Sequence, residues 1–228
     1  MNKLLLSLTP LAALFVCNFA MATTTADLTV TGQIIPATCN ISLTGGGVIN
    51  YGTLSVGGLD PVDSTLITPS MSGTHPKSTM NINCDAPAQI AVNVTDNRAA
   101  TVNLDVLTGG TLPGATVEQV FGMGADGVGT NIGAFTITST SGGTLVDSAP
   151  GRVIESFDGN SWAHSTGEFN NTANWRMSWA SVAGNTPEPI QAIAQELEIQ
   201  AAVTATENLD TSVPINLDGS VTIELVYL

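Results

Sequence analysis

Few residues in this sequence are placed to do catalytic chemistry. A G-x-G-x-x-G pattern runs from Gly122 to Gly127. A dinucleotide-binding loop of this pattern needs a strand before it, a helix after it and an acidic residue about 20 positions further on. The residues that follow, VGTNIGAFTI, instead indicate a turn and then a strand. We therefore predict a glycine-rich hairpin at this position.

The imidazole and carboxylate side chains form no recognisable catalytic set. His75 and His164 lie in loop-like sequence, and neither stands in a motif with a serine or cysteine nucleophile. A glycosidase needs only two carboxylates, but nothing singles out a pair among the 19 acidic residues. No calcium loop of the D-x-[DN]-x-[DN]-G type is present. We expect no enzymatic activity, no cofactor and no metal; a secreted hydrolase would have to depend on carboxylates that the sequence does not mark.

All three tryptophans lie in a segment, about Gly109 to Thr186, that is rich in Gly, Ser and Asn. Trp162, Trp175 and Trp179 could stack on a sugar ring. The cores of β-sandwiches also contain buried tryptophans, and we favour packing in the core or under loops. The carbohydrate site is kept as an alternative.

The start of the chain has the features of an export signal. Lys3 precedes an apolar run from Leu4 to Ala20, which ends in the small-x-small triplet Ala20-Met21-Ala22. We predict a signal peptide over residues 1–22, with cleavage after Ala22 or alternatively after Ala20. Cleavage after Ala22 leaves 206 residues, which is enough for one large domain.

Cysteine usage agrees with export. Cys17 lies within the signal, so the mature chain keeps Cys39 and Cys84. An even pair of cysteines in an exported chain indicates a disulfide. A metal pair or a reactive thiol is disfavoured, because there is no C-x-x-C spacing and no nearby cluster of histidines.

The charge balance excludes whole classes of partner. Without Lys3, four basic residues face 19 acidic ones, a net formal charge of −15. Nucleic-acid binding needs a basic stripe, which four scattered cations cannot make. Binding to an anionic membrane surface is disfavoured for the same reason.

Apolar residues alternate with polar ones along most of the mature chain, which is typical of strands. Alternation occurs near Met80 and Ile82, over Ile90–Val94, at Phe135 and Ile137, and over Val221–Tyr227. Only Pro189–Val203 also fits helical spacing, and there we favour a strand over Gln195–Val203. Many short strands separated by glycine-rich turns predict an all-β sandwich or barrel in a single domain with long loops.

Both ends of the mature chain carry alternating strands. Ala26, Leu28 and Val30 share one face just after Thr23, and Gly32 and Pro36 follow them. A loosely attached strand with one apolar face can join the open sheet edge of another subunit. Contacts of this kind run head to tail, do not close and grow into filaments.

Several sequence blocks resemble a fimbrial subunit of the chaperone–usher class, close to the beta-fimbriae major-subunit-like family of Gram-negative bacteria. Besides the signal and the Cys39/Cys84 pair, the blocks are ADLTVTGQIIPATC, VTDNRA (Val94–Ala99), FGMGADGVGTNIGAF (Phe121–Phe135) and the C-terminal LDGSVTIELVYL. The resemblance implies an incomplete immunoglobulin-like (pilin) sandwich over residues 32–228, completed by donor-strand exchange.

The resemblance also implies roles for particular residues. Residues 23–31 would be the N-terminal donor-strand extension, in which Ala26, Leu28 and Val30 fill pockets of a neighbouring subunit and Gly32 marks the junction. A C-terminal strand would line the groove edge and pair with a periplasmic chaperone through Val221, Ile223, Leu225 and Tyr227. The glycine that the class places before this strand corresponds to Ile215 here, and the nearest glycine is Gly219. The register of the groove is therefore left open.

The function implied is that of a structural subunit, exported to the periplasm and assembled into a cell-surface fimbria. Its expected partners are neighbouring copies, a periplasmic chaperone and an outer-membrane usher. The alternative is a tip or adaptor protein, or a carbohydrate-binding adhesin built around the tryptophans. A typical tip adhesin carries a separate binding domain and no donor strand, which disfavours this alternative.

Overall fold

The computed structural model describes residues 25–73, 76–112 and 114–228. The chain divides into two units, residues 1–35 and residues 36–228. The predicted signal peptide and the first two residues of the predicted donor extension lie outside the described residues. None of the helices in the described ranges has the length and apolar character needed to cross a membrane.

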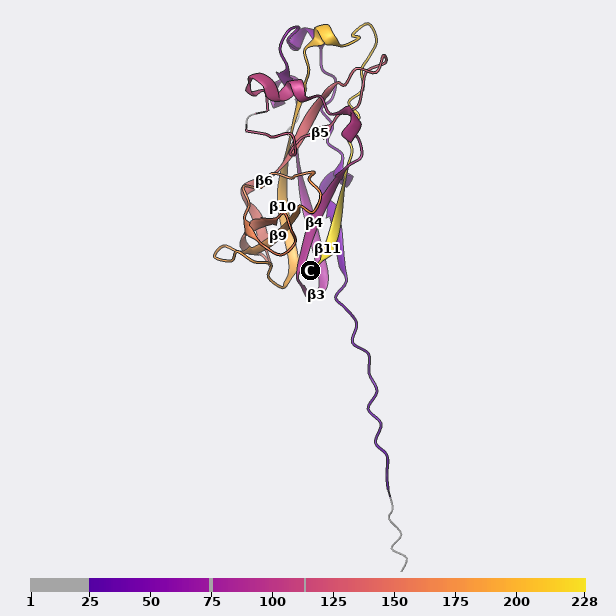
Figure 1. Ribbon diagram of the computed structural model, residues 1–228, viewed down its shortest axis with the longest axis vertical. Coiled ribbons are helices and arrows are strands. Elements are labelled where there is room, and N and C mark those ends of the chain that lie inside the picture. Colours follow the sequence, from indigo (N-terminus) through magenta and orange to yellow (C-terminus); the bar gives the residue numbers. More distant parts are fainter. Residues whose placement is uncertain (1–24, 74–75, 113) are drawn as a thin grey trace, which may run out of the picture. The chain divides into compact units, whose positions relative to one another are not determined.

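Residues 36–228 form an all-β unit, as the alternating patterns predict (Figure 1). Its described strands are β1 (Cys39–Leu43), β2 (Thr65–Leu66), β3 (Lys77–Ala88), β4 (Ile90–Asp96), β5 (Phe121–Gly122), β6 (Gly133–Val146), β7 (Ala149–Ser156), β8 (Ala163–His164), β9 (Arg176–Ser181), β10 (Ile190–Val203) and β11 (Val221–Tyr227). The described helical segments are short: α1 (Pro69–Ser72), η1 (Thr44–Gly47), η2 (Val56–Gly58), η3 (Ala99–Thr101), η4 (Leu104–Gly110) and η5 (Thr206–Asn208).

The strands form two antiparallel layers joined through the β6–β7 hairpin. In one layer the order is β1-β3-β10-β6, with β2 paired to β10 and β5 paired to β6. In the other layer β7 pairs with β9, β9 with β4, and β4 with β11, while β8 pairs with β7. The hairpin pairs Leu145 with Pro150 and Val146 with Ala149. The first strand and the last strand therefore lie at the edges of different layers.

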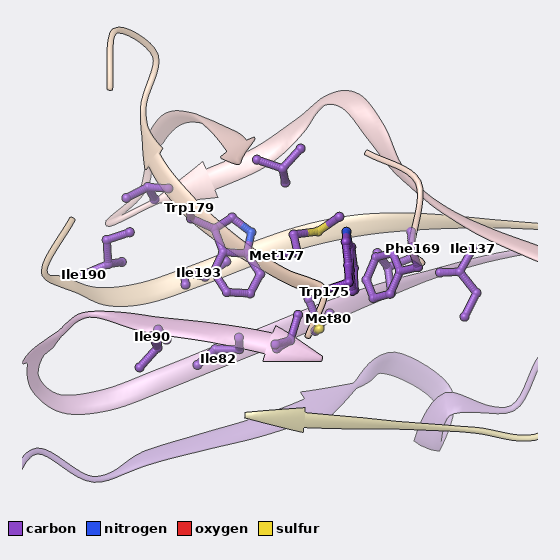
Figure 2. Close-up of a cluster of buried hydrophobic side chains, with 14 of the residues drawn as sticks. Met80, Ile82, Ile90, Ile137, Phe169, Trp175, Met177, Trp179, Ile190 and Ile193 are labelled. Atoms are coloured by element: carbon purple, nitrogen blue, oxygen red, sulfur yellow. The ribbon is translucent and has the colours of Figure 1, made fainter. Parts of the chain in front are cut away.

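Apolar side chains of both layers pack into one core. Figure 2 shows Trp175, Met177 and Trp179, from β9 and the turn before it, among side chains that include Met80 from β3 and Ile193 from β10. Trp175 and Trp179 are buried, as the core interpretation predicts. Neither indole face is available to stack on a sugar, so the three tryptophans do not form the carbohydrate platform of the alternative.

Two segments whose sequence allowed more than one structure adopt the structure that we favoured. Residues Gln195–Val203 lie within the long strand β10. Residues Gly122–Gly127 belong to a hairpin that begins in β5, turns at Asp126–Gly129 and returns through the bridge between Ala125 and Asn131. The predicted disulfide joins Cys39 and Cys84, which are paired residues of β1 and β3. It covalently fixes the N-terminal end of β1 to its layer.

The described part of the other unit, residues 25–35, contains no helix or strand, and its side chains are exposed. Leu28, Val30 and Ile34 are 92%, 88% and 99% exposed. Large apolar side chains in water are unfavourable, by roughly 1.5–3 kcal/mol each relative to a buried state. The segment therefore carries apolar surface that has no partner within the described chain.

Candidate functional site: a groove between the first and last strands

The outer edge of β1 is not paired with another strand of the described chain. β3 pairs with β1 on its other side, with Cys39 opposite Cys84 and Ile41 opposite Ile82. The amide of Asp85 donates to the carbonyl of Thr38, so the hydrogen-bonded positions on the β3 side are Thr38, Asn40 and Ser42. The backbone groups of Cys39, Ile41 and Leu43 consequently point away from β3, and the side chains of these three residues are partly buried.

β11 presents the same arrangement at the edge of the other layer. Among the described strands it pairs only with β4, with Ile223 opposite Val94 and Tyr227 opposite Ile90. The amide of Leu228 donates to the carbonyl of Gln89, and that of Asn97 donates to the carbonyl of Ser220. By alternation, the outward backbone groups belong to Val221, Ile223, Leu225 and Tyr227. These are the four residues that the sequence assigned to the C-terminal pairing strand.

The two free edges face each other across an apolar groove, and they run in opposite directions. Cys39 at the start of β1 contacts Tyr227 at the end of β11, because the Cys39 amide donates to the Tyr227 hydroxyl at 2.7 Å. Leu43 at the end of β1 lies with Val221 and Ile223 at the start of β11 in the lining of one cavity. A strand that enters between them must therefore pair parallel to one and antiparallel to the other.

The middle of the groove is a chamber of about 280 Å³, here called the first chamber. Its walls come from both edges and its floor from β6 and β10. The apolar residues that line it are Leu43, Ile49, Tyr51, Met123, Phe135, Ile137, Leu197, Ile199, Ala201, Leu217, Val221 and Ile223. Most of these side chains also pack against the core, so the groove is an opening into the core itself.

The groove continues into a second chamber of about 660 Å³, at the end away from Tyr227. Ile49, Tyr51 and Leu217 line both chambers and therefore stand at their boundary. The other apolar residues of the second chamber are Leu54, Val56, Leu59, Ile132, Val203, Leu209, Val213, Pro214 and Ile215. Val56, Val213 and Leu217 are substantially exposed there, so apolar surface is uncovered at this end too.

Tyr51 is the most buried polar group at the boundary between the chambers. Its hydroxyl donates to the carbonyl of Ile199 at 2.8 Å. Burial, followed by the nearby Glu198 carboxylate, raises the pKa of Tyr51 well above its ordinary range. The hydroxyl is therefore a fixed hydrogen-bond donor that holds the loop after η1 onto β10, and it is not an acid or base at physiological pH.

The segment before β11 is held in place by contacts with the β4–η3 turn and with Met123, the residue after β5. The guanidinium of Arg98 donates from its Nε to the Asp218 carboxylate at 2.9 Å, and the Asp218 amide donates to the carbonyl of Met123 at 2.9 Å. A Cβ on Gly219 would come within 2.6 Å of the Phe135 ring. A larger residue at this position would therefore have to displace the Phe135 ring or the chain, which here passes over the floor of the first chamber.

Asp126 fixes the far wall of the second chamber. Its carboxylate accepts from the amide of Asp210 at 2.9 Å and, within its own hairpin, from Thr130 at 2.7 Å and Val128 at 3.1 Å. These amides, that of Asp210 foremost, hold the pKa of Asp126 below its ordinary value. This glycine-rich hairpin thus anchors the 209–217 segment at Asp210.

The structure places the sequence-derived site residues in two groups. Val221 and Ile223 line the first chamber, Leu225 packs against the core, and Tyr227 bridges to β1. Ala26, Leu28, Val30 and Gly32 lie in the exposed segment and line no described cavity. His164 lies in the two-residue strand β8 and is exposed, while His75 lies outside the described residues.

Sequence reasoning missed the floor of the groove. Phe135, Ile137, Leu197 and Ile199 were identified only as strand residues, and Tyr51 was not singled out. Among the described residues, no cluster of three or more His, Cys, Asp and Glu side chains is placed to hold a metal. Chemically, the site offers apolar pockets flanked by free backbone donors and acceptors, which suits an extended peptide.

Comparisons with known proteins find relatives that align with nearly the whole chain. Protein GltF of Escherichia coli (strain K12) is 30% identical over 243 aligned positions, which cover 95% of this chain and 95% of that protein. The model of a family described as "Protein of unknown function (DUF1120)" matches residues 28–136. This chain belongs to the DUF1120 family.

A second relative of this DUF1120 protein is the uncharacterized protein YhcF of the same organism, which is 25% identical over 233 positions and 92% of this chain. The description of this family states no function, so the likeness to the beta-fimbriae major-subunit-like family stays a prediction from the sequence blocks. The matched residues 28–136 include Leu28 and Val30 of the exposed segment, β1 and the start of β6. They therefore cover parts of both the exposed segment and the groove.

Proposed function

We propose that this chain is a structural subunit of a surface fimbria, and that a segment donated by the next copy fills its groove. The observation that carries the proposal is the pair of facing edges, β1 and β11, with apolar pockets between them and no strand of the described chain in the gap. A sandwich normally covers such edges, because unpaired strand edges and open apolar grooves favour aggregation. An incoming strand would supply both the missing hydrogen bonds and the missing apolar contacts.

The proposed donor is the exposed segment of another copy. In an extended chain, side chains two residues apart share a face, so Ala26, Leu28, Val30, Gly32 and Ile34 all point the same way. The side chains of Ala26, Leu28 and Val30 would occupy the first chamber, and that of Ile34 would occupy the second. Gly32, which has no side chain, would lie just before the boundary that Tyr51 and Leu217 mark between the chambers. The donor thus extends past residues 23–31, the range expected from the sequence alone.

The direction of the donor follows from which end of the groove is open. The donor is free at its N-terminal side and attached to its own body at its C-terminal side. The Tyr227–Cys39 contact bridges one end of the groove, and the second chamber opens at the other. The attached side must leave through the open end, so the donor would run parallel to β1 and antiparallel to β11.

This direction generates a filament. Residues before Cys39 leave the 36–228 unit at the Tyr227 end, where β1 begins, while the groove receives its donor from the opposite end. Each copy would therefore bind the next one head to tail, and such contacts do not close on themselves. Burial of Leu28, Val30 and Ile34 would contribute roughly 1.5–3 kcal/mol each before ordering costs, and backbone hydrogen bonds would add to this.

The same groove requires a helper before assembly. A chain exported through its predicted signal would reach the periplasm with its groove open, so a periplasmic chaperone strand would occupy the groove first. An outer-membrane usher would then exchange that strand for the donor of the next copy at the cell surface. The outward backbone groups of Val221, Ile223 and Leu225 are the pairing positions for either strand, and Tyr227 lies at the end of this row.

Deletion of residues 23–31 from the full-length chain tests the proposal. Electron microscopy of cells that express the chain with its own assembly partners should show fibres for the unaltered protein and none for the deletion, which should accumulate in the periplasm bound to a helper. A matched control carries Asp27→Asn and Thr29→Ser, which alter only the other face of the donor, and it should still form fibres. Fibres of ordinary length from the deletion variant would refute the proposal.

A further inference from the structure

Tyr227 joins the two edges of the groove at one end, and both of its attachment points are fixed. Its hydroxyl accepts from the Cys39 amide at 2.7 Å, and Cys39 is tied to β3 by the disulfide with Cys84. The backbone at Tyr227 is held to β4 opposite Ile90, and the next amide, that of Leu228, donates to Gln89 at 3.0 Å. The side chain therefore spans the position of the missing strand between two rigid supports.

This contact removes a pairing position from the groove. Cys39 has its amide on the outward side of β1, where a neighbouring strand would otherwise supply a carbonyl. The Tyr227 hydroxyl takes that place, and the side chain of this residue, which is 50% exposed as a whole, stands in the path of a strand at this level. The outward positions that stay open are Ile41 and Leu43 on β1, and Val221, Ile223 and Leu225 on β11.

A groove of this kind needs something to fix register, because the apolar pattern of the donor does not. A slip of one residue turns every side chain to the wrong face, so the pattern excludes it. A slip of two residues keeps the apolar side chains facing inward. Each apolar residue of the donor would then occupy the groove pocket assigned to its apolar neighbour, for example Ala26 the pocket of Leu28. A structure at one end of the groove would distinguish these registers.

We propose that Tyr227, through its hydrogen bond to the Cys39 amide, is the register stop of the groove. This inference rests on the proposed donor-strand function. An antiparallel donor that ends at Tyr227 places Ala26 beside Leu225, Leu28 beside Ile223 and Val30 beside Val221. Gly32 then reaches the level of Gly219, and Ile34 that of Leu217, which borders the second chamber. Tyr227 is a positioning residue, since it sets where the donor lies and does not fill a pocket.

Engineered disulfides between donor and acceptor report the register directly. Two full-length versions of the chain are co-expressed: an acceptor carrying Leu225→Cys, and a donor carrying either Ala26→Cys or Leu28→Cys. Mass spectrometry of the assembled material then gives the cross-link ratio, defined as the yield with the Ala26→Cys donor divided by the yield with the Leu28→Cys donor. The acceptor is made with Tyr227 intact, with Tyr227→Phe, with Tyr227→Ala, and with Thr222→Ala as a control on the face of β11 away from the groove.

With Tyr227 intact, the cross-link ratio should be at least about ten in favour of the Ala26→Cys donor, which corresponds to about 1.4 kcal/mol. Tyr227→Ala should lower the ratio by at least about tenfold, because the donor can then slide past the former stop. Tyr227→Phe should lower the cross-link ratio by a smaller factor, because the ring is kept while the hydrogen bond to the Cys39 amide is lost. Thr222→Ala should leave the ratio unchanged.

The outcomes separate the inference from the function on which it rests. A ratio that is the same in all acceptors, or a nearly even ratio with Tyr227 intact, overturns the register stop while leaving donor exchange in place. A native ratio in Tyr227→Phe overturns the part assigned to the hydroxyl. If neither donor cross-links to the intact acceptor, the donor-strand function fails and the register stop fails with it. If the Tyr227→Ala acceptor does not accumulate in the cell, the cross-link ratio of the Tyr227→Phe acceptor tests the register stop in its place.

Discussion

Gly219 lies directly over the ring of Phe135, so closely that a Cβ at residue 219 would stand 2.6 Å from the Phe135 Cε1 atom. Both residues line the first chamber, one from the segment before the last strand and the other from β6. The close approach brings the start of β11 down onto the floor of the groove.

Gly219→Ala should therefore deform the groove more than it lowers the stability of the core. The added methyl must displace Phe135 or lift the chain, and overpacking of this kind costs about 1–3 kcal/mol. Urea unfolding of the mature protein measures that cost, and fibre yield measures the effect on the groove. Gly58→Ala is a suitable control, because a Cβ there meets no atom within 4 Å. Equal fibre yield for the two variants would argue against the role assigned to Gly219.

The two faces of the donor segment should respond differently to charge. Leu28→Asp places a carboxylate in an apolar pocket without a partner, which is strongly unfavourable, so fibres should be lost. Thr29→Asp adds the same charge on the opposite face and should preserve assembly. Electron microscopy and the yield of assembled material give the comparison. Loss of fibres in both variants, or in neither, would contradict the alternation on which the donor model depends.

The disulfide should contribute much of the stability of the unit. Cys39 and Cys84 close a loop with a sequence separation of 45, for which chain entropy gives roughly 4 kcal/mol. Cys39→Ser should lower the free energy of unfolding by about that amount, measured with urea in the absence of reductant. Cys84→Ser and the reduced unaltered protein provide matched comparisons and should agree with it. Identical thermal stability of the unaltered protein with and without reductant would count against this assignment.

Much of the fold followed from alternation and turn residues, because period-two patterns of Val, Ile and Thr report directly on half-buried strands. The strands at Met80–Ile82, Ile90–Val94 and Val221–Tyr227 are local in origin and were predicted correctly. The Cys39–Cys84 pair was predicted correctly from the number of cysteines in the predicted mature chain. The groove was harder, since its floor is built by Phe135, Ile199 and Tyr51, which are far apart in sequence. The contact of Tyr227 with Cys39 has no sequence signal, because it depends on which two edges remain unpaired.

Trp179 should behave as a core residue. Its side chain is fully buried, and large-to-small substitutions at such sites cost about 3–5 kcal/mol. Trp179→Ala should therefore lower the free energy of unfolding in urea by that amount, whereas Trp162→Ala, at a partly exposed site, should change it much less. A Trp179→Ala variant of undiminished stability that had lost binding on a glycan array would instead favour the adhesin alternative.

The second chamber should loosen in acid. Backbone amides, that of Asp210 first, lower the pKa of Asp126 below its ordinary value of 3.8. A carboxyl whose pKa is lowered by folding contributes stability that is complete above its ordinary pKa and is lost as the pH falls through the lowered value. Stability should therefore decline below about pH 4. Asp126→Asn should be less stable at pH 7 and show a shallower decline. An unchanged acid profile would contradict the contribution of Asp126.

Native mass spectrometry of the mature chain, purified from the export compartment without denaturant, tests the central claim most directly. The claim is that the groove between β1 and β11 is filled by a strand from another molecule. The predicted result is a set of complexes, either chains bound to one another or chains bound to a helper protein, without a stable free chain. A long-lived, soluble single chain with no bound partner and an open groove would contradict the account.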